Sequence, residues 1–554
     1  MFIDARHLAA SEIQADLCVI GTGPAGLAVA RHVAPSRDVL VLEAGPNADD
    51  ARSQAEYRGE SVGLPYFDLD ACRTRRFGGS ANCWGGYCRP FESLDFEPRE
   101  RIPHSGWPIR IEDVWPYYER AHAVCRLGPL NYQYDFWVPE RRADGTPFRG
   151  RHIAPEIRQK AQFDLEAVRE DVGARPNVRV CLNATVTEIL LDEAGRTVKA
   201  VAVRDPAGVT RTVRASRFVV AAGGIENARL LLASRRVQPG GVGNDRDLVG
   251  RFFMEHVDFH TGFFAPADPA RFRHQLAWRA AGGTLVRNSL AVAEPIRRRE
   301  QLLRCFFHVG EQSVERTHGY RSAVHILEQV RHGRRISNLR YHWRNLLWDR
   351  RALAAAAAWR LHLSAGDPGA TGRPGLLRLR VTAEPTPNPA SRVMLAGATD
   401  RFGMPRARLD WRIDPADYVH VRRSLALFAE DVRQLGLGRP DVWPHERWPT
   451  RGTYHHMGTT RMSADPARGV VDADCRVHGV SNLYIAGSSV FPTAGSGTPT
   501  LMIVALALRL ADHLEAAAKD DPIAVHAIAG RGGSHGPAPA APASRRAGGP
   551  QTLP

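Results

Sequence analysis

The fold is decided by residues 16–43, which read DLCVIGTGPAGLAVARHVAPSRDVLVLE. The apolar run at 16–20 ends at Gly21 and is typical of a buried strand, and residues 25–33 have the apolar spacing of a helix. Residues 39–42 form a second apolar run. Strand, helix and strand in this order make a βαβ unit, which predicts an α/β fold with a parallel sheet.

Three glycines join the first strand to the helix, because Gly21, Gly23 and Gly26 have the spacing GxGxxG. Gly21 permits a tight turn, Gly23 lets the backbone approach a pyrophosphate, and Gly26 lets helix and strand pack closely. The helix N-terminus favours the phosphate charge. Glu43 ends the next strand, where its carboxylate can accept hydrogen bonds from ribose hydroxyls. The segment therefore predicts a dinucleotide site, but it does not separate FAD from NAD.

The composition is that of a folded protein without a surface shaped for polyanions. The 554 residues are 44% hydrophobic and 24% charged. The net charge of +15 comes almost wholly from arginines scattered among acidic residues, so we expect no nucleic-acid partner. No signal peptide is evident, and no apolar run approaches the roughly 20 residues that span a bilayer. We therefore expect a cytoplasmic protein without a membrane span.

The eight cysteines are dispersed along the chain and form no CxxC pair. This spacing indicates neither a zinc site nor a disulfide framework, and most of the thiols are expected to be buried. No other metal-binding motif is evident, so the sequence predicts no metal site.

Five further segments resemble the signatures of one family. They are 77–86 (FGGSANCWGG), 221–230 (AAGGIENARL), 250–256 (GRFFMEH), 454–459 (YHHMGT) and 486–501. In this order they resemble the glucose-methanol-choline (GMC) oxidoreductase family. The stretches GGSANCWGG and HHMGTTRM are most similar to its sugar-oxidising, pyranose oxidase-like members. The resemblance implies FAD rather than NAD as the cofactor.

The remaining patterns predict the domain organisation. Strand-like runs recur at 178–203 and 218–222, and an apolar helix is predicted at 501–514. Alternating apolar residues at 377–381 and 408–413 indicate strands of a separate domain. We expect an α/β protein, α+β overall, whose Rossmann-type FAD-binding domain is assembled from discontinuous segments. The expected parts are FAD-binding segments at 1–257 and 450–516, a substrate domain of antiparallel sheet with helices at 258–449, and a disordered tail at 522–554.

The arginine- and tryptophan-rich stretch 340–363 predicts a helix with two possible roles. It is either an amphipathic element for a membrane surface or a partner, or a helix packed on the substrate domain with its arginine heads in water. The second role is the one we expect.

Glycines in the segment 77–86 would let main-chain amides approach the cofactor, and Ser80 and Asn82 supply short polar groups there. The resemblance implies that Val186 flanks the adenine and that Gly487 lies near the pyrophosphate or the ribityl chain. The full set of expected cofactor contacts is Gly21, Gly23, Pro24, Gly26, Glu43, Gly79, Ser80, Asn82, Cys83, Val186, Ala222, Gly487 and Pro499.

Cys83 stands where pyranose oxidases and some relatives carry a histidine that bonds covalently to the flavin. A cysteinyl link is chemically possible at this position, and a buried, unlinked cysteine is the alternative. We expect FAD to be bound non-covalently.

Alcohol oxidation by a flavin needs a hydride acceptor, flavin N5, and a base for the hydroxyl proton. His455 occupies the position of the family's catalytic histidine in the pattern HxxGT, and imidazole suits that role. His456 is expected to support it. Thr498 stands where the family usually has Asn or His; it can orient a substrate oxygen but cannot act as a base near neutral pH. Either His455 works with less help, or another residue substitutes, or the reaction has changed.

The sequence therefore predicts an FAD-dependent oxidoreductase that oxidises a CH–OH group of a sugar, a glycoside or a polyol. The alternatives are an FAD-containing lyase on the same fold and a non-enzymatic flavin-binding protein. The sequence leaves the electron acceptor open among oxygen, a quinone and an electron-transfer protein.

Overall fold

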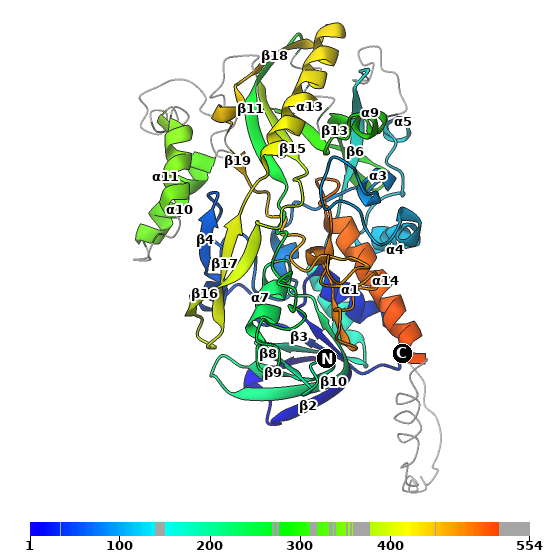
Figure 1. Cartoon of the computed structure of the whole chain (residues 1–554), viewed down its shortest axis with the longest axis vertical. Coiled ribbons are helices and arrows are strands. Elements are labelled where there is room, and N and C mark those ends of the chain that lie inside the picture. Colours follow the sequence, from blue (N-terminus) through cyan, green and yellow to red (C-terminus); the bar gives the residue numbers. More distant parts are fainter. Residues whose placement is uncertain are drawn as a thin grey trace, which may run out of the picture.

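The computed structural model describes most of the first 519 residues (Figure 1). The described residues are 1–519 apart from 34, 139–149, 269–271, 273–275, 277, 311–317, 332–335, 337–338, 351–352, 355–356, 358–376 and 449. The tail predicted at 522–554 lies outside the described residues. So does most of 349–363, the second part of the helix predicted at 340–363.

The βαβ unit predicted at the N-terminus is confirmed and lies at the centre of the first sheet. Strand β2 (Glu12–Ile20) pairs in parallel with β3 (Val39–Leu42) on one side and with β10 (Thr210–Val220) on the other. Helix α1 (Pro24–His32) connects β2 to β3. The sheet is completed by β1 (Phe2–Asp4), β7 (Val178–Leu182), β8 (Thr185–Leu191), β9 (Val198–Arg204) and β20 (Leu483–Ile485).

Residues distant in the chain return to this sheet, as the Rossmann-type domain of discontinuous segments requires. Strand β20 pairs in parallel with β10, and the C-terminal helix α14 (Thr500–Lys519) packs on α1 (Figure 1). The side chains of α14 at 501–508 are almost fully buried. Helix α7 (Glu226–Ala233) follows β10 on the same part of the domain. Burial of α14 therefore joins the two ends of the chain in one core.

The second sheet is antiparallel throughout its described pairs, which confirms the architecture predicted for the substrate domain. Helix α13 (Pro415–Gln434) packs on it (Figure 1). The sheet contains β5 (Tyr87–Cys88), β6 (Ile153–Lys160), β11 (Val257–Pro266), β12 (Trp278–Ala281), β13 (Thr284–Val292), β14 (Cys305–Gly310), β15 (Leu377–Ala383), β18 (Gly438–Val442) and β19 (Thr450–Arg451).

Two of these strands come from a segment that the sequence analysis assigned to the FAD-binding domain. Strands β5 and β6 lie within 1–257, yet β6 pairs with β13 over its whole length. The apolar pattern of a strand indicates that it is buried but does not identify its partner. The chain therefore passes between the two sheets more often than the predicted boundaries allow.

A small third sheet is separate from the two large ones. It consists of β16 (Arg392–Thr399), β17 (Pro405–Trp411) and β4 (Glu60–Gly63). The strand predicted at 408–413 is therefore present, but it pairs with β16 and β4 and not with the large antiparallel sheet. The short helices are α2 (Ala51–Gln54), α3 (Ser93–Phe96), α4 (Trp115–Val124), α5 (Tyr134–Trp137), α6 (Leu165–Ala174) and α9 (Glu294–Glu300).

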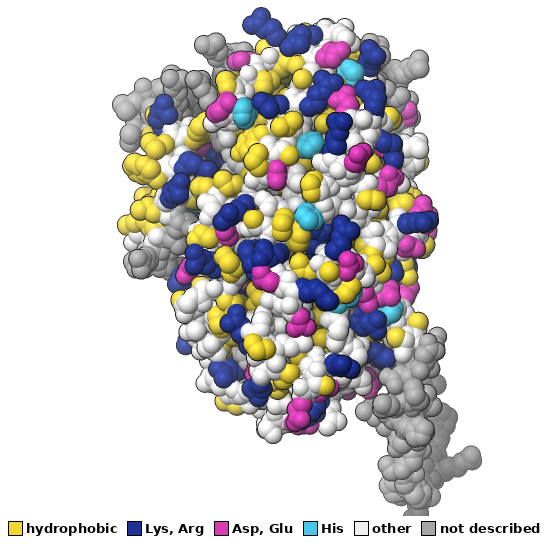
Figure 2. Space-filling model, viewed as in Figure 1, with side chains coloured by type: hydrophobic (Ala, Val, Ile, Leu, Met, Phe, Trp, Pro, Cys, Tyr) yellow, Lys and Arg dark blue, Asp and Glu magenta, His cyan; other side chains and the backbone are white. Residues whose placement is uncertain are grey.

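Two helices, α10 (His318–Arg331) and α11 (Leu339–Trp348), lie against each other at the side of the molecule (Figure 1). Helix α11 confirms the first part of the helix predicted at 340–363. Among the described helices, none combines the length and the apolar character needed to cross a membrane. Figure 2 shows basic and acidic side chains interspersed over the face in view.

A substitution at Gly26 tests how closely α1 packs on the glycine turn that follows β2. A Cβ at this position would lie 2.0 Å from the carbonyl oxygen of Gly21, a backbone atom that cannot move aside. We expect Gly26→Ala to lower the free energy of unfolding by about 1–3 kcal/mol and to reduce bound cofactor. Thermal unfolding and cofactor content of the purified protein measure both effects.

Gly397→Ala is the matched control, because a Cβ there would meet no atom within 4 Å. It should change the free energy of unfolding by less than about 0.5 kcal/mol. Equal stability of the two variants would contradict the packing role of Gly26.

Candidate active site

The carboxyl ends of four parallel strands meet at one cavity of about 480 Å³. The residues that follow β2, β3, β10 and β20 all line it, as expected for a ligand site in an open α/β sheet. Its volume is within the usual range for small-molecule sites. Of the predicted site residues, those that line the cavity are Gly21, Gly23, Pro24, Glu43, Gly79, Ser80, Cys83, Val186, Ala222, His455, His456, Gly487, Thr498 and Pro499.

The turn after β2 has the geometry that its glycines predict. Gly21 has a φ of +108°, and Gly23 is the N-cap of α1, whose first turn faces the cavity. The N–H groups of Thr22 and Gly45 donate to the Glu43 carboxylate at 3.0 and 2.8 Å. Burial raises the pKa of Glu43. Gly26 does not line the cavity, since it packs against Gly21 within the turn.

Three glycines leave open space in the cavity that a cofactor such as FAD can fill. A Cβ at Gly23 or Gly487 would have its nearest neighbour at 3.9 or 4.0 Å, and a Cβ at Gly223 would have none within 4 Å. All three residues line the cavity, so side chains there would occupy the space that the cofactor needs. The glycine turn, the helix N-terminus and Glu43 supply the groups that a dinucleotide requires.

The loop of the 77–86 segment forms a short 3₁₀ helix at Gly79–Cys83. Ser80 and Cys83 line the cavity, whereas Asn82 does not: its amide donates to the carbonyls of Phe77 and Gly79 at 2.9 and 2.7 Å and holds the turn. Cys83 is exposed and lines the cavity, so the burial expected for an unlinked cysteine at this position is not found. Its Sγ lies 3.2 Å from the Ser80 carbonyl oxygen. The other seven cysteines are buried and free, as predicted.

His455 has one ring nitrogen held by the protein. Its Nδ1 lies 3.0 Å from His256 Nδ1 and 3.0 Å from Thr453 Oγ1. Burial lowers the pKa of His455 well below its usual value, and burial lowers that of His256 to about 4. Both rings are therefore neutral near pH 7. No described residue hydrogen-bonds to Nε2 of His455, so this atom can accept a proton from a ligand in the cavity.

His456 points to a different partner from His455. Its Nε2 lies 2.9 Å from the hydroxyl of Tyr66, and burial lowers its pKa to about 3. The backbone carbonyl of His456 accepts a hydrogen bond of 2.7 Å from Ser488 Oγ. His456 therefore links Tyr66 to Ser488, and its Nε2 is held by the Tyr66 hydroxyl.

Glu255 connects the two histidines. Its carboxylate is fully buried and accepts hydrogen bonds from the His455 N–H at 2.7 Å, from Thr453 Oγ1 at 2.9 Å and from the Tyr66 hydroxyl. Sequence reasoning assigned no role to Glu255, His256, Thr453 or Tyr66. The segment 250–256 was recognised only as a family signature, although the polar pair Glu255-His256 directly before the apolar strand β11 was a usable signal.

Thr498 lies in the cavity wall just before α14 and is 2% exposed. Its hydroxyl is 3.3 Å from Ser496 Oγ, and either hydroxyl can donate. The remaining hydrogen-bonding capacity of Thr498 is available to an oxygen of a bound ligand.

Curated proteins of known activity resemble the chain over most of its length. The 6'''-hydroxyparomomycin C oxidase of Streptomyces lividus is 26% identical, and the match covers 90% of this chain and 92% of that protein. The paromamine 6'-oxidase of Streptomyces fradiae is 27% identical, with 90% of each chain covered.

Solved structures share the fold. An FAD-dependent oxidoreductase from Chaetomium thermophilum superimposes with a TM-score of 0.52 at 17% identity, covering 91% of this chain and all of that one. Two family models described as GMC oxidoreductase match residues 97–258 and 387–507, together slightly more than half of the sequence. The matches contain His256 and His455, whose Nδ1 atoms lie 3.0 Å apart. The chain therefore belongs to the GMC oxidoreductase family.

Proposed function

We propose that the protein oxidises a CH–OH group of a sugar or glycoside with FAD as its cofactor. The observation that carries this proposal is the orientation of His455, which faces the cavity with Nδ1 held and Nε2 available. The named activities of the two Streptomyces relatives, oxidases of paromamine and of a paromomycin derivative, support an amino sugar or a glycoside as the substrate class. Neither relative is a lyase, so the lyase alternative has no support from them.

In the proposed reaction His455 Nε2 takes the substrate hydroxyl proton. Bound FAD supplies the hydride acceptor. His256 and Thr453 hold His455 Nδ1, which fixes the ring orientation and the tautomer. Thr498 donates a hydrogen bond to the substrate oxygen in place of the usual Asn or His side chain.

FAD is proposed to be non-covalent, with Cys83 beside it as a free thiol. The Cys83 thiol hydrogen-bonds to the Ser80 carbonyl, an arrangement that needs no link to the cofactor. We also propose the cytoplasm as the compartment. All eight cysteines lie in the described part of the chain and are free, which suits a reducing compartment.

His455→Gln tests the proposed base. Glutamine keeps the approximate volume but cannot take the proton, so the rate of flavin reduction by a reactive sugar should fall by about 10²–10⁴-fold. The measurement is stopped-flow bleaching of the flavin absorbance under anaerobic conditions, after a panel of sugars, aminoglycosides and simple alcohols has identified a substrate.

His478→Gln is the matched control, because His478 does not line the cavity and its Nε2 binds the Ser463 carbonyl. It should reduce its flavin at the wild-type rate. An undiminished rate in His455→Gln, with FAD content unchanged, would show that His455 is not the base.

The pH dependence follows from the lowered pKa of His455. A base must be unprotonated, and its burial holds this pKa well below 6.5 in the folded protein. The kcat/KM of a neutral substrate should therefore stay level as pH falls from 8 to 6.5, whereas a base with the usual pKa of about 6.5 would lose half its activity there. Steady-state kinetics across this range decide the point, and a half-maximal value near pH 6.5 would refute the neutral, buried state of His455.

A further inference from the structure

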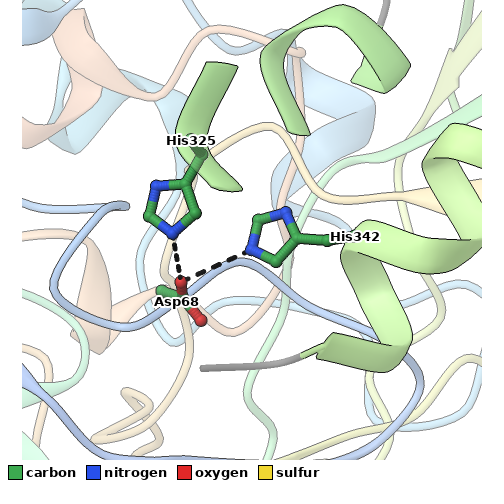
Figure 3. A group of neighbouring side chains, drawn as sticks. All are labelled: Asp68, His325 and His342. Atoms are coloured by element: carbon green, nitrogen blue, oxygen red, sulfur yellow. Dashed lines mark ion pairs between the residues drawn. The ribbon is translucent and has the colours of Figure 1, made fainter. Parts of the chain in front are cut away.

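Three side chains outside the cavity converge on one point: Asp68, His325 and His342 (Figure 3). Asp68 Oδ2 lies 3.2 Å from His325 Nε2 and 3.6 Å from His342 Nε2. One nitrogen of each ring and one carboxylate oxygen all lie within 4.8 Å of one another. The two imidazoles are nearly parallel, with centroids 4.7 Å apart.

Hydrogen bonds alone do not account for this arrangement. His342 is 5% exposed, and neither of its ring nitrogens has a hydrogen-bond partner among the described residues. Its 3.6 Å separation from Asp68 is longer than a hydrogen bond. Imidazole nitrogens without a hydrogen-bond partner are available as metal ligands.

We propose that Asp68, His325 and His342 bind a zinc ion. Zinc lies about 2.0–2.2 Å from imidazole nitrogen and carboxylate oxygen, so two corners of its tetrahedron are about 3.4 Å apart. The two nitrogen–oxygen distances of 3.2 and 3.6 Å lie on either side of that value. Two histidines and one carboxylate are a known zinc ligand set that leaves the fourth position for water.

The ion would fasten two helices to the body of the protein. Asp68 follows β4 in the chain, His325 lies on α10 and His342 on α11 (Figures 1 and 3). The helix pair buries little apolar surface, because Leu327, Val330 and Trp343 are 60–68% exposed. A bound ion that joins both helices to Asp68 would lower the free energy of their docked position.

The zinc site lies behind one wall of the active-site cavity. The Tyr341 ring contacts the Phe67 ring at 5.5 Å, and Phe67 stacks on Tyr454 at 4.1 Å. These residues are the chain neighbours of His342, Asp68 and His455, and Tyr454 lines the cavity. The ion therefore positions an aromatic part of the substrate wall and takes no part in the proton transfer.

The sequence predicted no metal site because its ligands form no local motif. Asp68 is distant in the chain from both histidines, and the two histidines come from different helices. Only the docking of α10 and α11 beside residue 68 brings the three ligands together.

Metal analysis of the untagged flavoprotein tests the site directly. After treatment with a chelator, the protein is dialysed against zinc, and zinc per chain is measured by mass spectrometry. We expect one tightly bound zinc ion in the wild type and a loss of affinity of about 100-fold or more in Asp68→Asn and His342→Gln. Asp70→Asn and His7→Gln are matched controls on an adjacent carboxylate and an exposed histidine, and should bind zinc as the wild type does.

The flavin absorbance of each variant checks that it has folded. Hydrogen exchange of the wild type provides a second readout, because zinc should slow the exchange of amides in α10 and α11. In steady-state kinetics, removal of zinc should raise KM more than it changes kcat. The proposal is overturned if the wild type binds no zinc, if the two ligand variants bind it as tightly as the controls, or if zinc leaves exchange in both helices unchanged.

Discussion

The active site depends on one buried carboxylate, that of Glu255. A carboxylate without water is stable only when hydrogen-bond donors surround it, and Glu255 is surrounded by the backbone of His455, the hydroxyl of Thr453 and the hydroxyl of Tyr66. Each donor belongs to a group that positions a histidine: Thr453 contacts the ring of His455, and Tyr66 that of His456. Loss of the carboxylate would leave these donors unsatisfied and would loosen the groups that position the two rings.

This constraint acts where the two domains meet. Glu255 lies two residues before the antiparallel strand β11. The cavity, in contrast, lies at the carboxyl ends of the parallel strands. The residues after the strands of the first sheet and His455, which follows β19 of the second sheet, therefore line the same cavity. Gly224 makes the contact close, since a Cβ there would lie 2.3 Å from the His456 carbonyl oxygen. The family signatures thus specify contacts between domains as much as contacts with a cofactor.

The sequence predicts those parts of the fold and site that depend on short segments. The βαβ unit and Gly21 follow from periodicity and a local motif, whereas the assignment of His455 depends on the resemblance to the GMC family. The Tyr66–Glu255 hydrogen bond joins residues 189 positions apart, and His256 meets His455 across 199 positions, so no local pattern contains either pair. The same holds for β6, whose apolar pattern predicts burial but not the sheet that it joins.

The central claim is that the cavity at the ends of the parallel strands binds FAD without a covalent link and presents it to His455. The most direct measurement is the visible absorption spectrum of the purified protein, followed by acid precipitation and quantification of FAD in the supernatant. The account predicts an oxidised-flavin spectrum and about one FAD released per chain. Protein that shows no flavin absorbance, even after incubation with FAD, would contradict the account, and flavin that stays in the precipitate would contradict the non-covalent state.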